Sequence, residues 1–305
     1  MIRYYSPTEI NRDRWDKLIA ASVNSLPYAC TWYLDAIHGD QWGALIEDDY
    51  TFVMPIPEKS KWAIAYLSTP LFIQQLGIFS EVPVEESKTQ SFLNELKTKF
   101  SYIDFNVNYG NPIESDTLFT TNQRTNLILP IPEDRTLIRN SFSENLLRNI
   151  QKAEKLKLYY GTCSVRSVIN LFSENKAATL PNWNEKNYIV LERLFHMASL
   201  RGFARSMGMY SQKHELLCGA IFIEWNGRSI FLFSGNSEEG KESGAMAYLI
   251  YQYILDAPTG TKIFDFEGSD NPGLKRFYES FGAIEQNYIH LKHNSLPFYM
   301  RWLKS

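Results

Sequence analysis

The stretch KIFDFEGSDNPGLKRFYESFGA, residues 262–283, gives the clearest indication of how the C-terminal part of the chain folds. Aromatic and acidic side chains alternate over residues 263–267. Because strand side chains have a period of two, this pattern predicts a strand with Asp265 and Glu267 on one face, about 7 Å apart. Phe264 and Phe266 are expected on the other face.

Asn271, Pro272 and Gly282, in the later part of the same stretch, predict a short helix. Asn271 is a favourable N-cap, and Pro272 suits the first helical position because no amide hydrogen bond is needed there. Gly282 suits the left-handed residue that ends a helix. We therefore expect a polar loop followed by a helix over residues 272–281.

A weaker copy of this pattern lies earlier in the chain. Residues 102–106 repeat the aromatic and acidic alternation, and Gly-Asn-Pro follows at residues 110–112. A glycine-led apolar segment precedes each copy, at residues 43–46 and 219–222. We interpret this as a duplicated α/β unit, with a chance similarity of short segments as the alternative.

Length and composition fit two folded domains. The chain has 305 residues, of which 44% are hydrophobic and 21% charged, and its net charge is -3. This composition excludes a disordered chain, and the charge argues against a protein that coats nucleic acid over a broad surface. Two prolines in NLILPIPEDRT place the expected boundary near residue 130, so that residues 1–130 and 131–305 form the two domains.

The chain shows no signal for the membrane. No apolar run reaches about 20 residues, and the first residues, MIRYYSPTEINRDRW, carry too many charges for a signal peptide. We expect a cytoplasmic protein without membrane insertion.

Hydrophobic periodicity predicts alternating helices and strands, an α/β class with mixed sheets flanked by helices. The Asn226-Gly227 pair predicts a tight hairpin turn. The expected helices cover residues 11–23, 84–100, 164–175, 186–201 and 245–255, together with one that Ser141 or Ser143 caps. The expected strands cover residues 43–46, 51–56, 102–107, 216–224 and 228–234.

Cysteines and histidines carry no recognisable metal pattern. Cys30, Cys163 and Cys218 are widely spaced, which predicts buried, reduced thiols and no disulfide framework. His214 lies four residues from Cys218, but both are expected on strands or loops, so a nucleophilic pair is not favoured. We expect no metal site.

Two groups of basic residues are candidates for anionic ligands. Arg148, Lys152 and Lys155 recur at spacings of four and three on one helix, which predicts either a solvated face or a site for phosphates. Arg201 lies directly before the segment of residues 202–212 and Arg205 lies within it. We expect this segment to be a polar, substrate-facing loop where the two arginines bind a carboxylate or phosphate.

The order of a hairpin, a strand, a loop and a capped helix resembles the GNAT acyltransferase superfamily. Its late motif of asparagine, an apolar residue, tyrosine and glycine falls on Asn271, Leu274, Tyr278 and Gly282. With the duplication, the whole chain resembles the FemABX branch, whose members carry two GNAT-like domains in tandem. The resemblance implies a fold of two such domains, each a central mixed sheet flanked by helices.

The resemblance also implies a chemistry and candidate catalytic residues. It suggests transfer of an acyl group from a coenzyme A thioester to a small-molecule or peptide amine, with Tyr278 as the acid. Glu267 or Asp265 would be the base, and amides of residues 230–234, near Ser234, would orient the carbonyl. Alternatively, Tyr278 is a core residue and the carboxylates cap the following loop.

A donor site is expected at residues 241–246. The coenzyme A motif [Q/R]xxGx[G/A] aligns with Lys241, Gly244 and Met246, of which only Gly244 fits. A helix that begins at Ala245 offers unpaired amides to a pyrophosphate of acetyl coenzyme A, with Asn271 as a further contact. The acidic residues of GNSEEGKESG argue the other way unless they point to solvent.

Two other functions stay open. Fem-type enzymes transfer amino acids from aminoacyl-tRNA to a cell-wall precursor, but their FKxxFG motif has a lysine where this chain has Tyr278. The long charged heptad segment expected for their helical arm is also absent from the sequence. The third reading is a GNAT-like binding protein without catalysis, in which side chains fill the cleft between the strands that end near Ser234 and Glu267.

Overall fold

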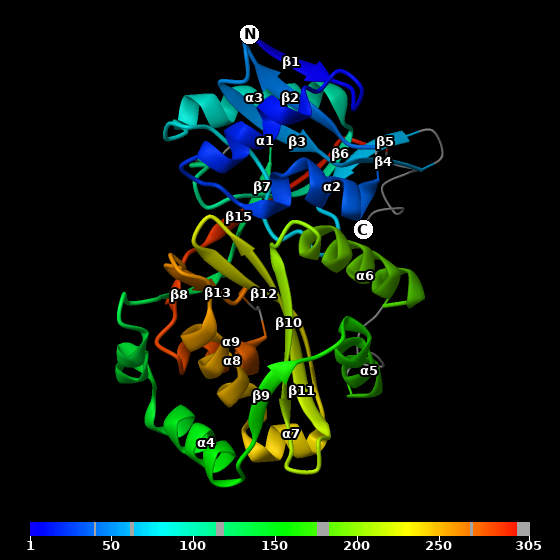
Figure 1. The fold of residues 1–305 in the computed structure, drawn as a ribbon. Coiled ribbons are helices and arrows are strands. Elements are labelled where there is room, and N and C mark those ends of the chain that lie inside the picture. Colours follow the sequence, from blue (N-terminus) through cyan, green and yellow to red (C-terminus); the bar gives the residue numbers. More distant parts are fainter. Residues whose placement is uncertain (40, 62–63, 114–118, 176–182, 269–270, 298–305) are drawn as a thin grey trace. The chain divides into compact units, whose positions relative to one another are not determined.

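The chain folds into two compact α/β units in the computed structural model, which describes residues 1–39, 41–61, 64–113, 119–175, 183–268 and 271–297 (Figure 1). The first unit comprises Met1–Arg124 and Asn287–Ser305, and the second comprises Thr125–Gln286. Each has a mixed sheet with helices packed against it, as the sequence predicts.

These units differ from the expected division at residue 130. Strand β8 (Leu127–Pro130) lies between β13 (Ile263–Asp265) and β14 (Ile284–Glu285), so the proline-containing segment begins as part of the second sheet. Strand β15 (Tyr288–Asn294) pairs with β6 (Tyr102–Val107) and β7 (Thr120–Arg124) of the first unit. The end of the chain thus belongs to the first unit, because strand pairing over long sequence separations overrides chain order.

The first unit contains two sheets. The three-stranded sheet has the order β1 (Ile2–Tyr5), β2 (Gly43–Glu47) and β3 (Phe52–Ile56), and the five-stranded sheet has the order β4-β5-β6-β15-β7. β4 covers Glu58–Lys61 and β5 covers Ile64–Ser68. The helices are α1 (Arg12–Ala21), α2 (Thr31–His38) and α3 (Glu86–Lys99), with a 3-10 turn, η1, at Pro27–Ala29.

The second unit is built on one seven-stranded sheet with the order β14-β8-β13-β12-β11-β10-β9. β11 (Leu216–Trp225) and β12 (Arg228–Asn236) form the predicted hairpin, and Asn226 and Gly227 both have positive φ, at 45° and 72°. β9 covers Tyr159–Thr162 and β10 covers Ala204–Tyr210. The expected polar loop at residues 202–212 is therefore wrong, because most of it pairs with β9 and β11.

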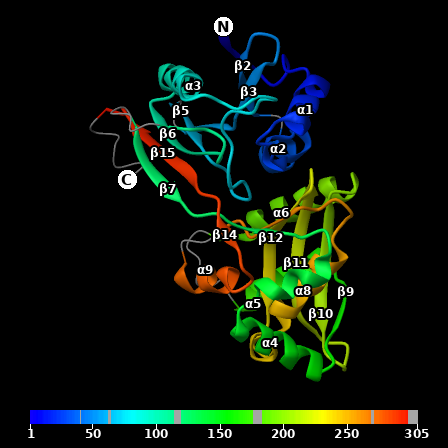
Figure 2. The same cartoon turned by 90° about the vertical axis from the view of Figure 1, so that its left-hand side faces the viewer.

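Helices cover both faces of this sheet (Figures 1 and 2). α4 (Glu144–Lys155), α8 (Ala245–Asp256) and α9 (Pro272–Glu279) contribute to one large core, whereas α5 (Val165–Asn175) packs on β11 and β12. α6 (Glu185–Ser199) packs on α5, and a 3-10 helix, η2, covers Arg135–Ser141. The expected loop before residue 245 contains a short helix, α7 (Glu238–Ser243), because Ser237 caps it by accepting from Gly240 N.

The two units share one strand pattern. β4-β5-β6-β15-β7 and β11-β12-β13-β8-β14 have the same sequence of pairings, antiparallel except for the parallel pairs β5-β6 and β12-β13. The repeats at residues 102–106 and 263–267 therefore begin on β6 and β13, which occupy equivalent positions in the two sheets. The segment of residues 43–46 is an exception, because it forms β2 in the separate sheet, whereas β11 corresponds to β4.

Four glycines form a row across the second sheet, and two of them, Gly219 and Gly235, face α5. Gly161, Gly208, Gly219 and Gly235 are register partners across β9, β10, β11 and β12. A Cβ atom at Gly235 would lie 2.5 Å from the carbonyl oxygen of Val168 on α5. The helix can approach β12 this closely only because no side chain separates them.

Candidate functional site

The candidate site begins where β12 and β13 part. Their parallel pairing covers three residue pairs and ends with Ile230 and Asp265. β12 continues to Asn236, but β13 stops because Glu267, with φ of 57°, turns the backbone into the left-handed region. The later part of β12 is consequently left without β13 at its side.

A β-bulge lies on β12 at this point. Ile221 of β11 pairs with Phe233, and the next residue, Phe222, pairs with Phe231, so Leu232 is an extra residue on β12. A bulge leaves its extra residue unpaired and redirects the neighbouring backbone groups. The predicted carbonyl-orienting segment, residues 230–234, thus contains an irregular backbone next to the parting strands.

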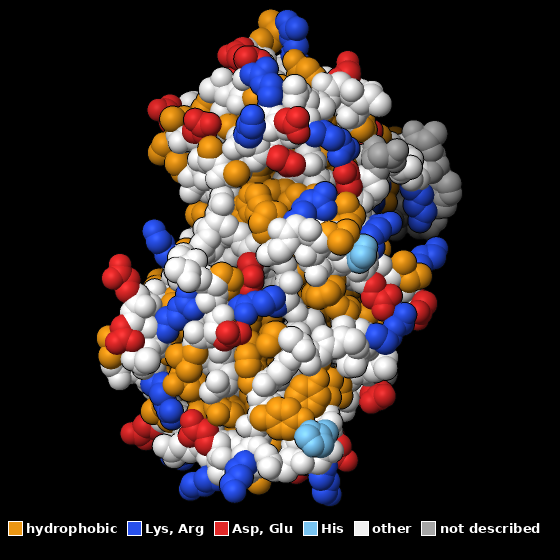
Figure 3. All heavy atoms as spheres, in the orientation of Figure 1, with side chains coloured by type: hydrophobic (Ala, Val, Ile, Leu, Met, Phe, Trp, Pro, Cys, Tyr) orange, Lys and Arg blue, Asp and Glu red, His pale blue; other side chains and the backbone are white. Residues whose placement is uncertain are grey.

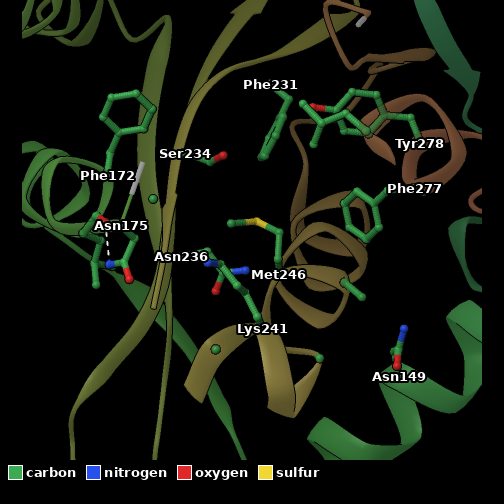
Figure 4. Close-up of a pocket in the computed structure, with 16 residues that line it drawn as sticks. Asn149, Phe172, Asn175, Phe231, Ser234, Asn236, Lys241, Met246, Phe277 and Tyr278 are labelled. Atoms are coloured by element: carbon green, nitrogen blue, oxygen red, sulfur yellow. Dashed lines mark hydrogen bonds between the residues drawn. The ribbon is translucent and has the colours of Figure 1, made fainter. Parts of the chain in front are cut away.

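A cavity of about 570 Å³ lies along this part of β12 (Figure 4). Ser234, Gly235 and Asn236 of β12 form one wall, and Figure 4 shows the Ser234 hydroxyl pointing into the cavity. The other walls come from α4, α5, the α7–α8 junction and α9. Five predicted site residues meet here: Ser234, Lys241, Gly244, Met246 and Tyr278.

The α8 end of the cavity has the features of an anion site. Gly244 precedes α8 with φ of 75°, and no side chain caps this helix. Its first amides, from Ala245 onward, have no acceptor within the helix, so they and the helix dipole favour a negative group. Gly244 has a packing role as well, because a Cβ atom there would lie 2.5 Å from the carbonyl oxygen of Asn149 on α4.

The charged side chains near this end are only partly balanced. Lys241 forms an ion pair with Glu238, and both side chains are exposed. Lys152 donates from Nζ to the carbonyl oxygen of Glu242 at 2.6 Å. Arg148 and Lys155, also on α4, are exposed.

Tyr278 occupies the opposite end of the cavity. Its side chain is only 7% exposed, and its ring stacks on Phe266 with a centroid separation of 4.5 Å. Figure 4 shows its hydroxyl pointing toward the cavity, near Phe231. Burial, and then the negative charge of Glu267, raise the pKa of Tyr278. The phenol is therefore both part of the core and protonated at neutral pH.

The two predicted carboxylates occupy different surroundings. Asp265 is fully buried, and its carboxylate contacts the guanidinium of buried Arg228 at 2.5 Å and accepts from Glu267 N at 2.8 Å. This ion pair gives Asp265 a structural role. Glu267 is half-buried and acts electrostatically on Tyr278, although it does not line the cavity.

Four other predicted residues lie outside the cavity lining. Ala245 is fully buried at the start of α8. Asn271 caps α9 by accepting from the amides of Gly273 and Leu274. Arg201 is exposed and donates to the carbonyl oxygen of Met197. Arg205 pairs with Glu224 at 2.6 Å and Asp256 at 2.8 Å, because it lies on β10 and not on a loop.

No thiol or metal centre emerges among the described residues. Cys30 and Cys218 are buried, Cys163 is partly exposed, and burial raises the pKa of all three thiols. His214 contacts the hydroxyl of Tyr159 at 2.6 Å. The part of the chain that the structure describes contains no cluster of three metal-binding side chains, and none of its helices is long and apolar enough to cross a membrane.

Several cavity residues carried no recognisable sequence signal. Asn149 on α4, Phe172 and Asn175 on α5, and Asn236 on β12 reach the cavity only through helix packing. The buried Oδ1 atom of Asn236 has no hydrogen-bond partner within the described residues. The glycines of β10, β11 and β12 were the one available hint, because a glycine in a strand often marks a close backbone approach.

Comparison with solved structures recognises this architecture. FemX superimposes with a TM-score of 0.65 over 92% of this chain and 96% of its own, at 13% sequence identity. The chain has the tandem GNAT fold. A tandem GNAT protein from the clavulanic acid biosynthesis pathway gives 0.56 over 97% and 99% of the two chains, at 10% identity.

A third similar structure is the C-terminal domain of a putative lysylphosphatidylglycerol synthetase from Agrobacterium fabrum. Its TM-score is 0.57 over 95% of this chain and 93% of its own, at 9% identity. No protein-family model and no curated protein matches the sequence. The expected resemblance to FemABX-like GNAT proteins, and the α/β class with mixed sheets, are confirmed at the level of the fold.

Proposed function

We propose that the second unit transfers an acyl group from a coenzyme A thioester to an amine. The observation that carries this proposal is the cavity along β12, which runs from the uncapped start of α8 to the hydroxyl of Tyr278. It offers helix amides for a phosphate-bearing carrier at one end and a proton donor at the other.

Each step of the reaction has a candidate group. The amine attacks the carbonyl carbon, and backbone amides at the Leu232 bulge are suited to hold the developing oxyanion. The carbon–sulfur bond then breaks, and Tyr278 donates its proton to the departing thiolate. Its raised pKa keeps the phenol protonated at neutral pH, as a proton donor must be, and excludes a role as base. Glu267 is the candidate that takes the proton from the amine.

The fit of the donor rests on groups already present. The first amides of α8 can bind a pyrophosphate, and Asn236 of β12 lines the cavity beside them. Met246 replaces the small residue of the coenzyme A motif, and the exposed acidic residues of α7 lower the local potential. We therefore expect binding that depends on backbone amides more than on side-chain charge.

A second candidate is an aminoacyl-tRNA donor, which the FemX-like fold and the basic α4 face favour. Arg148 and Lys155 are exposed on α4 near the cavity wall at Asn149. Charges of both signs are interspersed over the face in Figure 3, which disfavours broad electrostatic binding to nucleic acid. The non-catalytic alternative expects a filled cleft, and the cavity does not support it.

Ligand-induced thermal stabilisation separates these functions. A ligand that binds the folded state raises the melting temperature with the logarithm of its concentration relative to Kd. We expect a rise with coenzyme A and acyl coenzyme A. The melting temperature could instead rise only with an aminoacyl-tRNA minihelix, and this rise could disappear with added salt and in the Arg148→Ala/Lys155→Ala variant. The donor would then be aminoacyl-tRNA and not a coenzyme A thioester. No rise with any donor would refute catalysis by this site.

A further inference from the structure

The cavity lining contains almost no charge. Among the described residues that line it, Lys241 alone carries a formal charge, and this lysine lies at the α8 end and is paired with Glu238. The remaining polar side chains of the lining are neutral: Asn149, Asn175, Ser234, Asn236 and Tyr278. An ammonium substituent on the acyl group would lose its hydration in the cavity without meeting a carboxylate of the lining, whereas the acceptor amine attacks in its neutral form.

The Tyr278 end of the cavity is apolar. Phe231, Met246, Leu274 and Phe277 line it, and Figure 4 shows the thioether of Met246 and the two phenyl rings on the same side as the Tyr278 hydroxyl. Because the proposed reaction places the thioester sulfur near this hydroxyl, the acyl group must lie against these side chains. Methionine adapts its shape to an apolar partner more readily than other core residues.

The apolar surface continues on the α5 side of β12. Leu171 and Phe172 line the cavity there, and the Nδ2 atom of Asn175 is already engaged with the carbonyl oxygen of Leu171 at 2.8 Å. The glycine at position 235 lets α5 approach the sheet, so these side chains reach the edge of β12. An acetyl group would leave much of this surface uncovered.

We infer that the transferred acyl group is uncharged and apolar and contains more carbon atoms than acetyl. This inference rests on the proposed function and narrows it. It separates the site from one built for an aminoacyl group, because an α-ammonium among the apolar side chains at the Tyr278 end would meet no carboxylate of the lining. Glu267 acts on Tyr278 from outside the lining and does not supply this contact.

A chain-length series tests the inference. Dissociation constants and kcat/KM are measured for acetyl, butyryl, hexanoyl and 2-aminohexanoyl coenzyme A with the full chain. Each methylene buried should improve binding by about fourfold, so hexanoyl should exceed acetyl by on the order of 100-fold. The 2-amino compound should bind at least about tenfold more weakly than hexanoyl.

The outcomes distinguish this inference from the proposed function. If neither coenzyme A nor any thioester binds, both fail. If coenzyme A binds and acetyl is transferred but longer chains are rejected, the inference alone is wrong. Equal binding of the hexanoyl and 2-aminohexanoyl compounds would also overturn it, because a charged acyl group would then be accommodated.

Two variants locate the acyl group in the cavity. Leu274→Trp should reduce hexanoyl binding by at least about tenfold and acetyl binding by less, because it fills the apolar end. Leu255→Trp is the matched control, since Leu255 is a partly buried leucine on α8 outside the lining. Met246→Ala should shift the preference to chains longer than hexanoyl. An unchanged chain-length profile in both cavity variants would refute the assignment.

Discussion

The guanidinium of Arg228 contacts the carboxylate of Asp265 at 2.5 Å, with both side chains buried and 37 residues apart in the sequence. Arg228 also donates to Gln286 at 3.0 Å, and the Asp265 carboxylate accepts from the amide of Glu267. This pair joins the first residue of β12 to the last residue of β13, where the two strands part. It therefore holds the opening of the cavity without taking part in the reaction.

Removing one partner of this pair should destabilise the second unit. Asp265→Ala leaves a buried guanidinium uncompensated and is expected to lower the free energy of unfolding by about 3–5 kcal/mol. Lys275→Ala is the surface control, because its pairs with Glu279 and Glu285 lie at the surface and should contribute little to stability. Urea denaturation measures both, and equal effects would contradict the structural role.

Tyr278→Phe should lower turnover without weakening donor binding. The change removes only the proposed proton donor, so kcat is expected to fall by about 10²–10⁴-fold while the thioester Kd stays the same. Tyr251→Phe is a closely matched control, because Tyr251 is also 7% exposed but lies outside the cavity. Full activity of Tyr278→Phe with a confirmed substrate would remove Tyr278 from the mechanism.

The alkaline limb of the pH–rate profile tests the same residue. Burial and Glu267 raise the pKa of Tyr278 above its usual value of 10, so the acid form persists through neutral and mildly alkaline pH. Because the folded-state pKa is the higher one, the stability that this phenol contributes is present below pH 10 and decreases above it. Glu267→Gln removes a negative charge and should move the alkaline limb to lower pH. If the wild-type limb lay below pH 9 and Tyr278→Phe abolished it, Tyr278 would titrate below its usual pKa, and the raised pKa would be wrong.

Gly244→Ala should disturb the junction between α7 and α8. The positive φ and the approach of the Asn149 carbonyl oxygen both oppose a side chain, and the expected loss of stability is about 3 kcal/mol. Gly260→Ala separates the two effects, because Gly260 has φ of 86° but no atom within 4 Å of an added Cβ. It should cost only about 1 kcal/mol. Similar losses in thermal unfolding would show that packing against α4 is unimportant.

Gly235→Ala should push α5 away from the sheet. The added Cβ would lie 2.5 Å from the Val168 carbonyl oxygen and 2.7 Å from Leu171 Cβ, so a loss of about 2 kcal/mol and weaker donor binding are expected. Gly161→Ala in the same row meets only ordinary contacts at 3.6 Å and should change stability by less than about 1 kcal/mol. Thermal unfolding and coenzyme A titration compare the two variants directly.

Local chemistry was enough to predict part of this protein from its sequence. Asn271 and Ser143 cap their helices, and Asn226-Gly227 turns the hairpin, because each of these effects acts within a few residues. Alternating side chains predicted one face for Phe264 and Phe266, and the structure buries both in the core. The late motif, read as a resemblance, also placed Tyr278 on the helix whose side chain reaches the cavity.

Only the tertiary structure decided the rest. The return of β15 to the first unit, the pairing of Asp265 with Arg228 and the α5 wall of the cavity all join residues distant in sequence. Periodicity shows which face of a strand is buried, but it does not show which strand or helix covers that face. The sequence alone therefore determined the elements and their caps, whereas long-range packing determined the boundaries of the units and the walls of the site.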